Sequence, residues 1–245
     1  MILRDKKILF VHIPRTGGVS VERYFNWESG VGWKDSDLAQ HLTLEEYSWN
    51  NDLNDYFKFS FVRNPWDRLV SWFLWSQAEN LYFDYVAKNK IPQEEIPTTR
   101  FDSWKKGRLL LASAENILLE KDSFLSVKKS FGEFLEELQR RPLLYNKKYD
   151  DIKVLENRSK GRWVLPQVEW LKTQAGEKMD YVGRFESLQK DFIYVLKKTK
   201  NKICRLKHEG KIQSKPNYKK FYTRKTQGIV REIYNEDIEA FKYEF

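Results

Sequence analysis

The sequence predicts an α/β fold, with a central parallel sheet flanked by helices, in a single domain that covers residues 1–245. The first observation is that three short runs of β-branched and aromatic residues are each followed by apolar residues at helical spacing. The second is that 245 residues with 41% hydrophobic and 16% aromatic side chains are enough to bury a sizeable core. The third is that no internal repeat or low-complexity linker divides the chain.

The predicted strands are residues 7–13, 57–62 and 180–185, and the first has the pattern of a strand buried on both faces. Apolar residues at helical spacing follow each strand: Val19, Tyr24 and Phe25 after the first, Leu69, Val70 and Phe73 after the second, and Leu188, Phe192, Val195 and Leu196 after the third. Further amphipathic helices are predicted to cover the sheet, over residues 103–119, 124–140 and 226–241.

The longest apolar run, residues 8–13, is far shorter than the roughly 18 residues that span a bilayer, so we expect no membrane-spanning helix. Lys6 and Lys7 are not followed by a stretch long enough for a signal peptide, so we expect a cytoplasmic protein. The single cysteine, Cys204, excludes an intramolecular disulfide and thiolate zinc clusters, and we expect no metal site.

The formal net charge of +9 is concentrated in one segment of the chain. Residues 197–225, the basic strip, hold twelve Lys and Arg against one acid, Glu209, a balance of +11. The rest of the chain is close to neutral. A solvated loop is the simplest interpretation of such a run. The aromatic residues Tyr218, Phe221 and Tyr222 within the strip favour a binding role.

The first strand runs into the turn Pro14–Ser20, where Gly17 and Gly18 permit a tight bend and a close approach of the backbone to an anion. The spacing of a Walker A loop is missing, because the cationic residue, Arg15, precedes the glycines. A plain connector between strand and helix would have a similar composition.

The second strand ends at Arg63, and the residues that follow predict the start of a helix. Asn64 is a good N-cap, Pro65 suits the first helical position and Asp67 suits the positive helix end. Arg63 is then placed at the carboxyl end of the sheet, where open α/β folds bind ligands. An Arg63–Asp67 ion pair is the structural alternative. Two anion-competent strand ends in one sheet suggest a ligand with two phosphates.

Several segments resemble the carbohydrate-type sulfotransferases. Residues 10–20 are similar to the 5′-phosphosulfate-binding loop of that family, and residues 61–71 are similar to its 3′-phosphate-binding segment. Residues 181–188 resemble a third block, and the C-terminal stretch from Lys215 through Tyr222 and Tyr234 resembles the final segment. The resemblance implies a P-loop-like three-layer fold.

The resemblance also implies the donor 3′-phosphoadenosine 5′-phosphosulfate (PAPS) and in-line transfer of a sulfuryl group to an acceptor hydroxyl, with no metal. The donor-binding residues that it implies are Arg15, Thr16, Gly17, Gly18, Val19, Ser20, Arg63, Ser71, Lys215 and Tyr218. Arg15 is also implied as a catalytic residue, at a position where the family usually has lysine. A guanidinium can stabilise the leaving 5′-phosphate, as a planar fork rather than a point charge.

His41 resembles the histidine of a His-x-Thr segment that many members of the family carry, and it is the predicted general base. A capping or core role is the alternative for His41, and Glu22 and Asp37 are the next candidates for the base. His12 lies in the first predicted strand, and we expect it to be a hydrogen-bonded core residue.

We expect a hydroxyl-bearing acceptor, on a glycan or glycolipid, and no nucleic-acid partner. Two other functions stay open at this point. A kinase-like phosphotransferase is opposed by the missing Walker lysine position. A nucleic-acid-binding protein would use the basic strip, although the sequence contains no recognisable nucleic-acid-binding motif.

Overall fold

The computed structural model describes residues 1–29, 41–49, 51–92, 95, 130–140, 164–207 and 217–245. Its sheet has the strand order β1-β2-β3-β4, formed by β1 (Ile2–Leu3), β2 (Ile8–Val11), β3 (Phe57–Val62) and β4 (Tyr181–Arg184). Strands β2, β3 and β4 are parallel, as the sequence predicts, and β1 pairs antiparallel with β2. The two residues of β1 are too few to give a periodic signal, so the sequence pattern missed this strand.

The helices of the described residues are α1 (Gly18–Ser29), α2 (Leu44–Ser48), α3 (Pro65–Lys88), α5 (Phe131–Arg140), α7 (Gln167–Leu171), α8 (Leu188–Lys198), α9 (Arg224–Ile233) and α10 (Asn235–Phe241), with short 3₁₀ helices η5 (Phe185–Ser187) and η6 (Tyr218–Phe221). The helices predicted after each strand are confirmed as α1, α3 and α8. Of the covering helices, α5 lies within the predicted range 124–140, and the range 103–119 is outside the described residues.

The prediction of one helix over residues 226–241 is wrong, because α9 ends and α10 begins on either side of Tyr234. Tyr234 is fully buried, and its hydroxyl donates a hydrogen bond to the carbonyl oxygen of Val164. Anchoring this side chain in the core turns the chain, which redirects α10 toward α7. The apolar periodicity alone does not reveal this tertiary contact.

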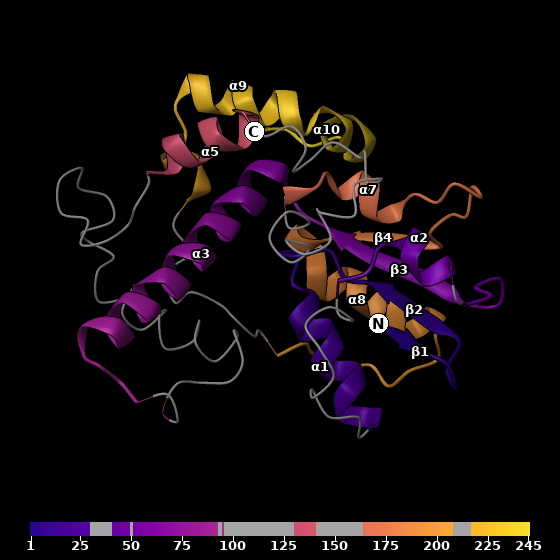
Figure 1. Cartoon of the computed structure of the whole chain (residues 1–245). Coiled ribbons are helices and arrows are strands. Elements are labelled where there is room, and N and C mark those ends of the chain that lie inside the picture. Colours follow the sequence, from indigo (N-terminus) through magenta and orange to yellow (C-terminus); the bar gives the residue numbers. More distant parts are fainter. Residues whose placement is uncertain (30–40, 50, 93–94, 96–129, 141–163, 208–216) are drawn as a thin grey trace.

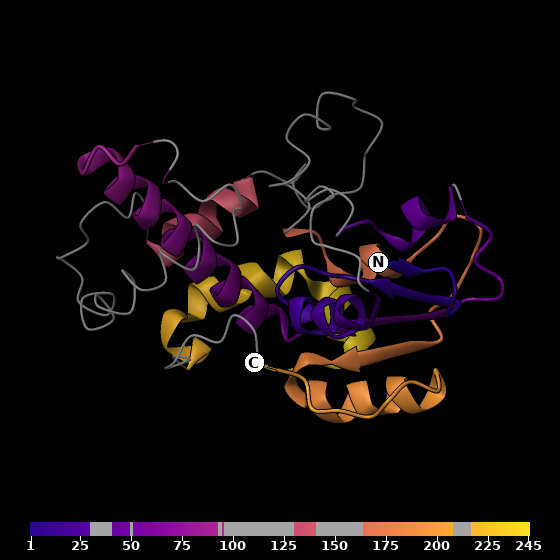
Figure 2. The ribbon, with the colours of Figure 1, turned by 90° about the horizontal axis from the view of Figure 1, so that it is seen from below.

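Helices cover both faces of the sheet, so the molecule has three layers in this region (Figures 1 and 2). On one face Phe10 and Phe59 pack against Phe25 of α1 and Phe192 of α8. On the other face the sheet packs against α2, α7 and the C-terminal end of the chain. Strand β2 is buried along its whole length, as the sequence predicts.

A further cluster of apolar side chains joins α3 to α5 and α9. The indole rings of Trp72 and Trp75 stack at 5.4 Å on α3, and Phe73 contacts Phe131 of α5 at 5.2 Å. Figure 1 shows α3 extending away from the sheet, with α5 and α9 beside its first half. The start of α3 is therefore fixed from two sides, by the sheet and by this helical cluster.

Candidate active site

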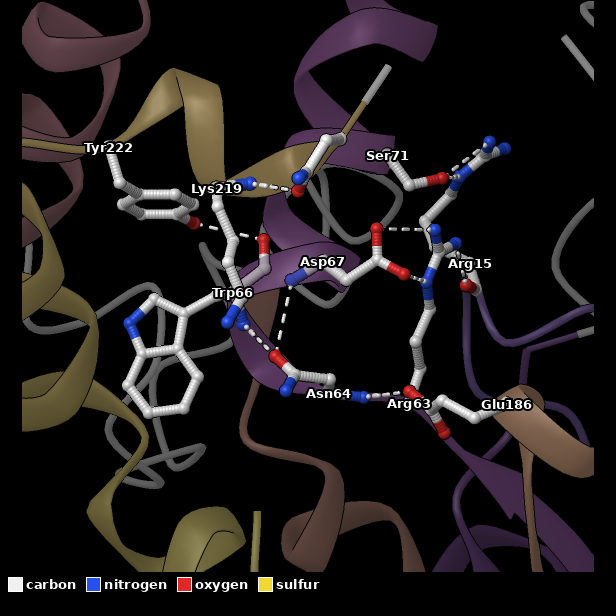
Figure 3. Close-up of polar contacts among 10 residues, drawn as sticks. Arg15, Arg63, Asn64, Trp66, Asp67, Ser71, Glu186, Lys219 and Tyr222 are labelled. Carbon is white, nitrogen blue, oxygen red and sulfur yellow. Dashed lines mark hydrogen bonds and ion pairs between the residues drawn. The ribbon is translucent and has the colours of Figure 1, made fainter. Parts of the chain in front are cut away.

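The turn after β2 and the start of α3 lie side by side at one edge of the sheet (Figure 3). Strands β2 and β3 are parallel neighbours, with Val11 beside Ser60. The segments that follow the two strands therefore leave the sheet at the same edge. The sequence argument placed two anion-binding segments at this carboxyl edge, and the structure brings their residues into direct contact.

The turn after β2 requires its glycines. Gly17 has a φ angle of +86°, and a Cβ there would be 2.7 Å from Cδ2 of Leu188. A Cβ on Gly18 would be 2.0 Å from Cδ2 of the His12 ring. Arg15 also has a left-handed conformation, with a φ angle of 71°. The turn is thus closely packed between the sheet and η5–α8, and it presents the Arg15 side chain toward α3.

The remaining predicted residues of this turn are mostly internal. Thr16 is fully buried and its hydroxyl donates to the carbonyl oxygen of Ile13 at 2.8 Å. Ser20 is buried, and its backbone N–H donates to the carbonyl oxygen of Gly17 at 3.1 Å. Val19 is half-buried in the first turn of α1. Thr16 therefore holds the turn through its side chain, which leaves Arg15 as the prominent cation.

The start of α3 forms as the sequence predicts. The Oδ1 atom of Asn64 accepts hydrogen bonds from the N–H groups of Trp66 at 3.1 Å and Asp67 at 3.4 Å, and Pro65 occupies the first turn. This cap satisfies two of the N–H groups that lack partners at a helix start.

Arg63 forms the ion pair considered above as the structural alternative. Its Nε donates to Oδ2 of Asp67 at 3.0 Å, and a terminal nitrogen lies 3.0 Å from Oδ1, with both side chains buried. The other terminal nitrogen donates to the carbonyl oxygen of Arg15 at 2.9 Å, and the guanidinium stacks 4.1 Å over Phe185. A guanidinium carries five N–H donors, so these contacts leave two of them.

The guanidinium of Arg15 has a different environment. It donates to the hydroxyl oxygen of Ser71, from Nε at 3.2 Å and from a terminal nitrogen at 3.0 Å. No carboxylate pairs with it in the part of the chain that the structure describes. Burial lowers the pKa of Arg15 to about 9, and the nearby positive charge of Arg63 contributes to this shift. Among the described residues, the site thus contains a positive charge that no carboxylate balances.

Arg68 supports the turn from inside the protein. Its Nε donates to the carbonyl oxygen of Pro14 at 3.1 Å, and a terminal nitrogen donates to that of Leu165 at 2.9 Å. The side chain is almost fully buried, and burial lowers its pKa. Arg68 therefore connects the turn after β2 to the segment before α7.

A second supporting network holds the backbone of Arg63, and sequence reasoning missed it. The side-chain amide of Gln167 accepts from the N–H of Arg63 and donates to its carbonyl oxygen, both at 2.8 Å. The buried carboxylate of Asp237 accepts from the Gln167 N–H at 2.8 Å, from its side-chain nitrogen at 3.2 Å and from the Val168 N–H at 2.9 Å. In the sequence, Asp237 is recognisable only as an acidic residue on the apolar face of the helical pattern over residues 226–241.

Two C-terminal segments close the site. Glu186 accepts from the N–H of Asn64 at 2.8 Å, and the hydroxyl of Tyr222 donates to the carbonyl oxygen of Trp66 at 2.9 Å (Figure 3). Predicted residue Tyr218 is half-buried on η6, and its pKa is raised by burial first and then by the charges of Asp67 and Glu186. Tyr218 thus lies beside the site, whereas Lys215 lies outside the described residues.

His41 lies next to the end of β2. Its Nδ1 is 3.2 Å from the carbonyl oxygen of His12, and the two rings are 4.4 Å apart. His12 is buried and its Nδ1 lies 2.8 Å from Oε1 of Glu22, so the expected core role of His12 is confirmed. The pairing also engages Glu22, one of the alternative bases, while Asp37 lies outside the described residues.

The basic strip is divided between two surfaces. Residues 217–225 form η6 and the start of α9, beside α3 and the candidate site. Residues 197–202 lie around the end of α8 toward the opposite edge of the sheet, where Lys6, before β2, donates to Asn201 at 2.9 Å. The chain then returns along α8, and the N–H of Leu206 donates to Gln189 in the first turn of that helix at 2.8 Å. Residues 197–202 are therefore remote from the candidate site.

Among the residues described, no group of three or more His, Cys, Asp or Glu side chains is placed to hold a metal ion, and no helix is long and apolar enough to cross a membrane. A comparison with family models matches residues 1–244 to the sulfotransferase family. The comparisons with curated proteins and with solved structures gave no match. The match extends over nearly the whole chain and includes the turn after β2 and the start of α3, so this chain belongs to the sulfotransferase family.

Proposed function

We propose that this enzyme transfers the sulfuryl group of PAPS to a hydroxyl of a glycan or glycolipid. The observation that carries the donor assignment is the Arg15 guanidinium, which lies in a glycine-containing turn beside Arg63 and pairs with no carboxylate of the described residues. Adjacent guanidiniums repel each other, so a polyanionic ligand at this position would be strongly favoured.

The residues fit a nucleotide with two separate phosphate groups. In this proposal the turn after β2 and Arg15 bind the 5′-phosphosulfate, because Gly17 and Gly18 permit a close backbone approach. The two remaining N–H donors of Arg63 and the hydroxyl of Ser71 bind the 3′-phosphate. The contact between Arg15 and Ser71 joins these two subsites.

Sulfuryl transfer needs a base for the acceptor proton and a stabilised leaving group. The contact between Nδ1 of His41 and the His12 carbonyl oxygen makes Nδ1 the protonated nitrogen, so Nε2 is the atom that takes the proton. As the acceptor oxygen forms its bond to sulfur, the bond from sulfur to the 5′-phosphate oxygen breaks, and Arg15 stabilises the charge on that oxygen. Arg15 keeps its own proton throughout.

The donor assignment is tested by thermal shift with 3′-phosphoadenosine 5′-phosphate (PAP), the desulfated product. PAP at about a hundred times its Kd should stabilise the fold by about 2.7 kcal/mol, which corresponds to a shift of several degrees. ATP, which lacks the 3′-phosphate, should give a clearly smaller shift. Equal shifts for the two ligands, or none for either, would remove the assignment.

The acceptor and the base are tested together with labelled PAPS. We expect label to reach acidic or neutral glycans, in preference to tyrosine peptides and simple phenols. His41→Ala should lower turnover about a hundredfold to ten-thousandfold and leave PAP affinity unchanged, because the base contacts only the acceptor. Transfer to phenols or peptides alone contradicts the carbohydrate acceptor, and near-normal turnover in folded His41→Ala contradicts the role of His41.

A further inference from the structure

The outer side of α8 and the segment after it form a continuous exposed surface, which we call the α8 face. Its exposed members are Lys190, Tyr194, Lys197 and Lys198 on α8, and Lys200, Lys202, Ile203, Arg205 and Lys207 in the following segment. The opposite side of the same helix packs on the sheet through Phe192, Val195 and Leu196. The segment is held along the helix, because the N–H of Leu206 donates to Gln189 at 2.8 Å and Tyr24 donates to the carbonyl oxygen of Lys202 at 2.7 Å.

The α8 face carries a strong positive charge. Residues 188–207 include seven Lys and Arg and a single acid, Asp191, which accepts hydrogen bonds from the N–H of Arg184 at 2.7 Å and from the hydroxyl of Ser187 at 2.8 Å. Within the described chain, ion pairs form elsewhere on the surface, such as Lys172–Glu236 and Lys225–Glu136, both at 2.8 Å or less. Six cations of the α8 face have no such pair in the described chain: Lys190, Lys197, Lys198, Lys200, Lys202 and Arg205.

Two large apolar side chains are exposed among these cations. Ile203 is 54% exposed and Tyr194 is 41% exposed, and both belong to the small set of large hydrophobic residues that the described part of the protein leaves in solvent. An aliphatic side chain beside clustered lysines gains nothing from a purely ionic partner. It gains free energy when it enters the interface of a lipid bilayer, whose anionic headgroups attract the lysines.

The part of the α8 face that holds Lys197 to Lys202 lies away from the candidate site, whereas Arg205 and Lys207 lie nearer the first turn of α8. Helix α8 starts beside the turn after β2 and runs back to the opposite edge of the sheet, where Lys6 contacts Asn201. Figure 2 shows α8 and the segment after it as the outermost layer on that side of the sheet. A partner on this surface would leave the carboxyl edge accessible.

We propose that the α8 face docks this protein onto the surface of an anionic lipid bilayer, through its exposed lysines and the inserted side chains of Ile203 and Tyr194. The docking is peripheral. It does not depend on the identity of the donor or of the acceptor, because none of its residues belongs to the candidate active site.

The test is co-sedimentation of the full chain with vesicles of phosphatidylcholine, with and without phosphatidylglycerol. We expect binding to the anionic vesicles only, decreasing as salt screens the exposed charges. Lys197→Glu with Lys202→Glu should weaken this binding at least about thirtyfold, since each cation near an anionic surface contributes severalfold. The control Lys88→Glu with Arg231→Glu makes the same change in net charge on other surfaces and should stay within about twofold of the wild type.

A second pair of variants tests the apolar contribution. Ile203→Ser should weaken binding to the anionic vesicles about tenfold, whereas Trp49→Ser, at an exposed residue on α2, should have no effect. An unchanged thermal shift with PAP verifies that every variant keeps its fold and its nucleotide site. Equal binding to neutral vesicles overturns the proposal. So does binding of duplex DNA or heparin that depends on Lys197 and Lys202 when vesicles do not bind, because that result assigns the surface to a polyanion.

Discussion

Arg15 and Arg63 are neighbours with opposite electrostatic surroundings. Arg63 is neutralised by Asp67 at 3.0 Å. Among the described residues, the guanidinium of Arg15 donates to the hydroxyl of Ser71 and pairs with no carboxylate, and its pKa is lowered by burial and by the repulsion of Arg63. A basic group whose pKa falls on folding destabilises the folded state at every pH below the lowered value. Because the pKa of Arg15 falls from 12.5 to about 9, this destabilisation is fully present at pH 7 and is relieved only as pH rises above about 9.

This contrast predicts opposite effects of two similar substitutions. At pH 7 Arg15→Gln should raise the unfolding temperature of the free protein by roughly 2 to 4 °C, the shift that corresponds to about 1 kcal/mol in a chain of this size. Arg63→Gln should lower it by more, because a buried Asp67 without its partner costs about 3 to 5 kcal/mol.

Thermal unfolding with and without PAP measures both effects. Both variants should lose most of the stabilisation that PAP gives to the wild type, because each removes a cation from the proposed nucleotide site. A lower unfolding temperature for Arg15→Gln would contradict this prediction. It would show that the Arg15 side chain stabilises the free protein, instead of carrying an unbalanced charge that only a bound anion offsets.

At the residue scale the sequence predicted the charged residues of the site but not the residues that position them. Arg15, Arg63 and Ser71 follow recognisable strand ends, so their meeting at one edge could be expected from a parallel sheet. The roles of Gln167 and Asp237 could not be predicted, because their contacts join residues about 70 and 104 positions apart.

At the scale of elements, the break between α9 and α10 has a consequence for the site. It directs Asp237 to the first N–H groups of α7, which has no side-chain cap of its own. A carboxylate at a helix start is favoured by the helix dipole, and here it also orients Gln167 against Arg63. The C-terminal helix thus stabilises the end of β3 through α7.

We predict that Asp237→Ala lowers stability by about 2 to 5 kcal/mol, since it leaves several buried N–H groups without an acceptor. PAP affinity should fall as well, because Asp237 would no longer hold Gln167 against the backbone of Arg63.

Glu236→Ala is the matched control on the same helix. Its exposed pair with Lys172 should contribute less than about 1 kcal/mol. Denaturant unfolding and PAP titration of both variants give the comparison, and a PAP affinity that stays normal in folded Asp237→Ala would limit this network to stability.

The elements that the sequence predicted correctly share strong local signals. Strand β2 is a continuous apolar run, β3 alternates phenylalanines with Lys58 and Ser60, and both end at proline-containing turns. Helix α3 begins with a clear cap at Asn64. The failure at Tyr234 has a physical cause, since a single buried tyrosine overrides a continuous helical periodicity. The periodicity of apolar residues shows which face of a helix packs against the core. It does not show where along the helix that packing surface ends.

At the scale of the whole molecule, the direction of α8 carries part of the basic strip away from the candidate site. The charge count along the chain describes one strip of +11, but the structure places residues 197–202 at the far end of α8, before the chain returns along that helix, and places η6 beside α3. A strand leaves the sheet at its carboxyl edge and the following helix returns the chain to the other edge. A basic segment that extends beyond such a helix is therefore distributed over both edges.

Hydrogen exchange can distinguish these two surfaces in one experiment. PAP at about a hundred times its Kd should slow exchange by up to about a hundredfold in residues 15–20, in the first turn of α3 and in η6, where local opening must first release the ligand. Residues 197–202 should exchange at the same rate with and without PAP, because they lie at the far end of α8 from the nucleotide. ATP should protect the turn after β2 less, and it should leave the first turn of α3 close to the rate of the free protein, since it lacks a 3′-phosphate. Slowing of residues 197–202 to the extent seen at the turn would mean that the basic strip closes over the nucleotide as one unit, and the assignment of two separate surfaces would then be wrong.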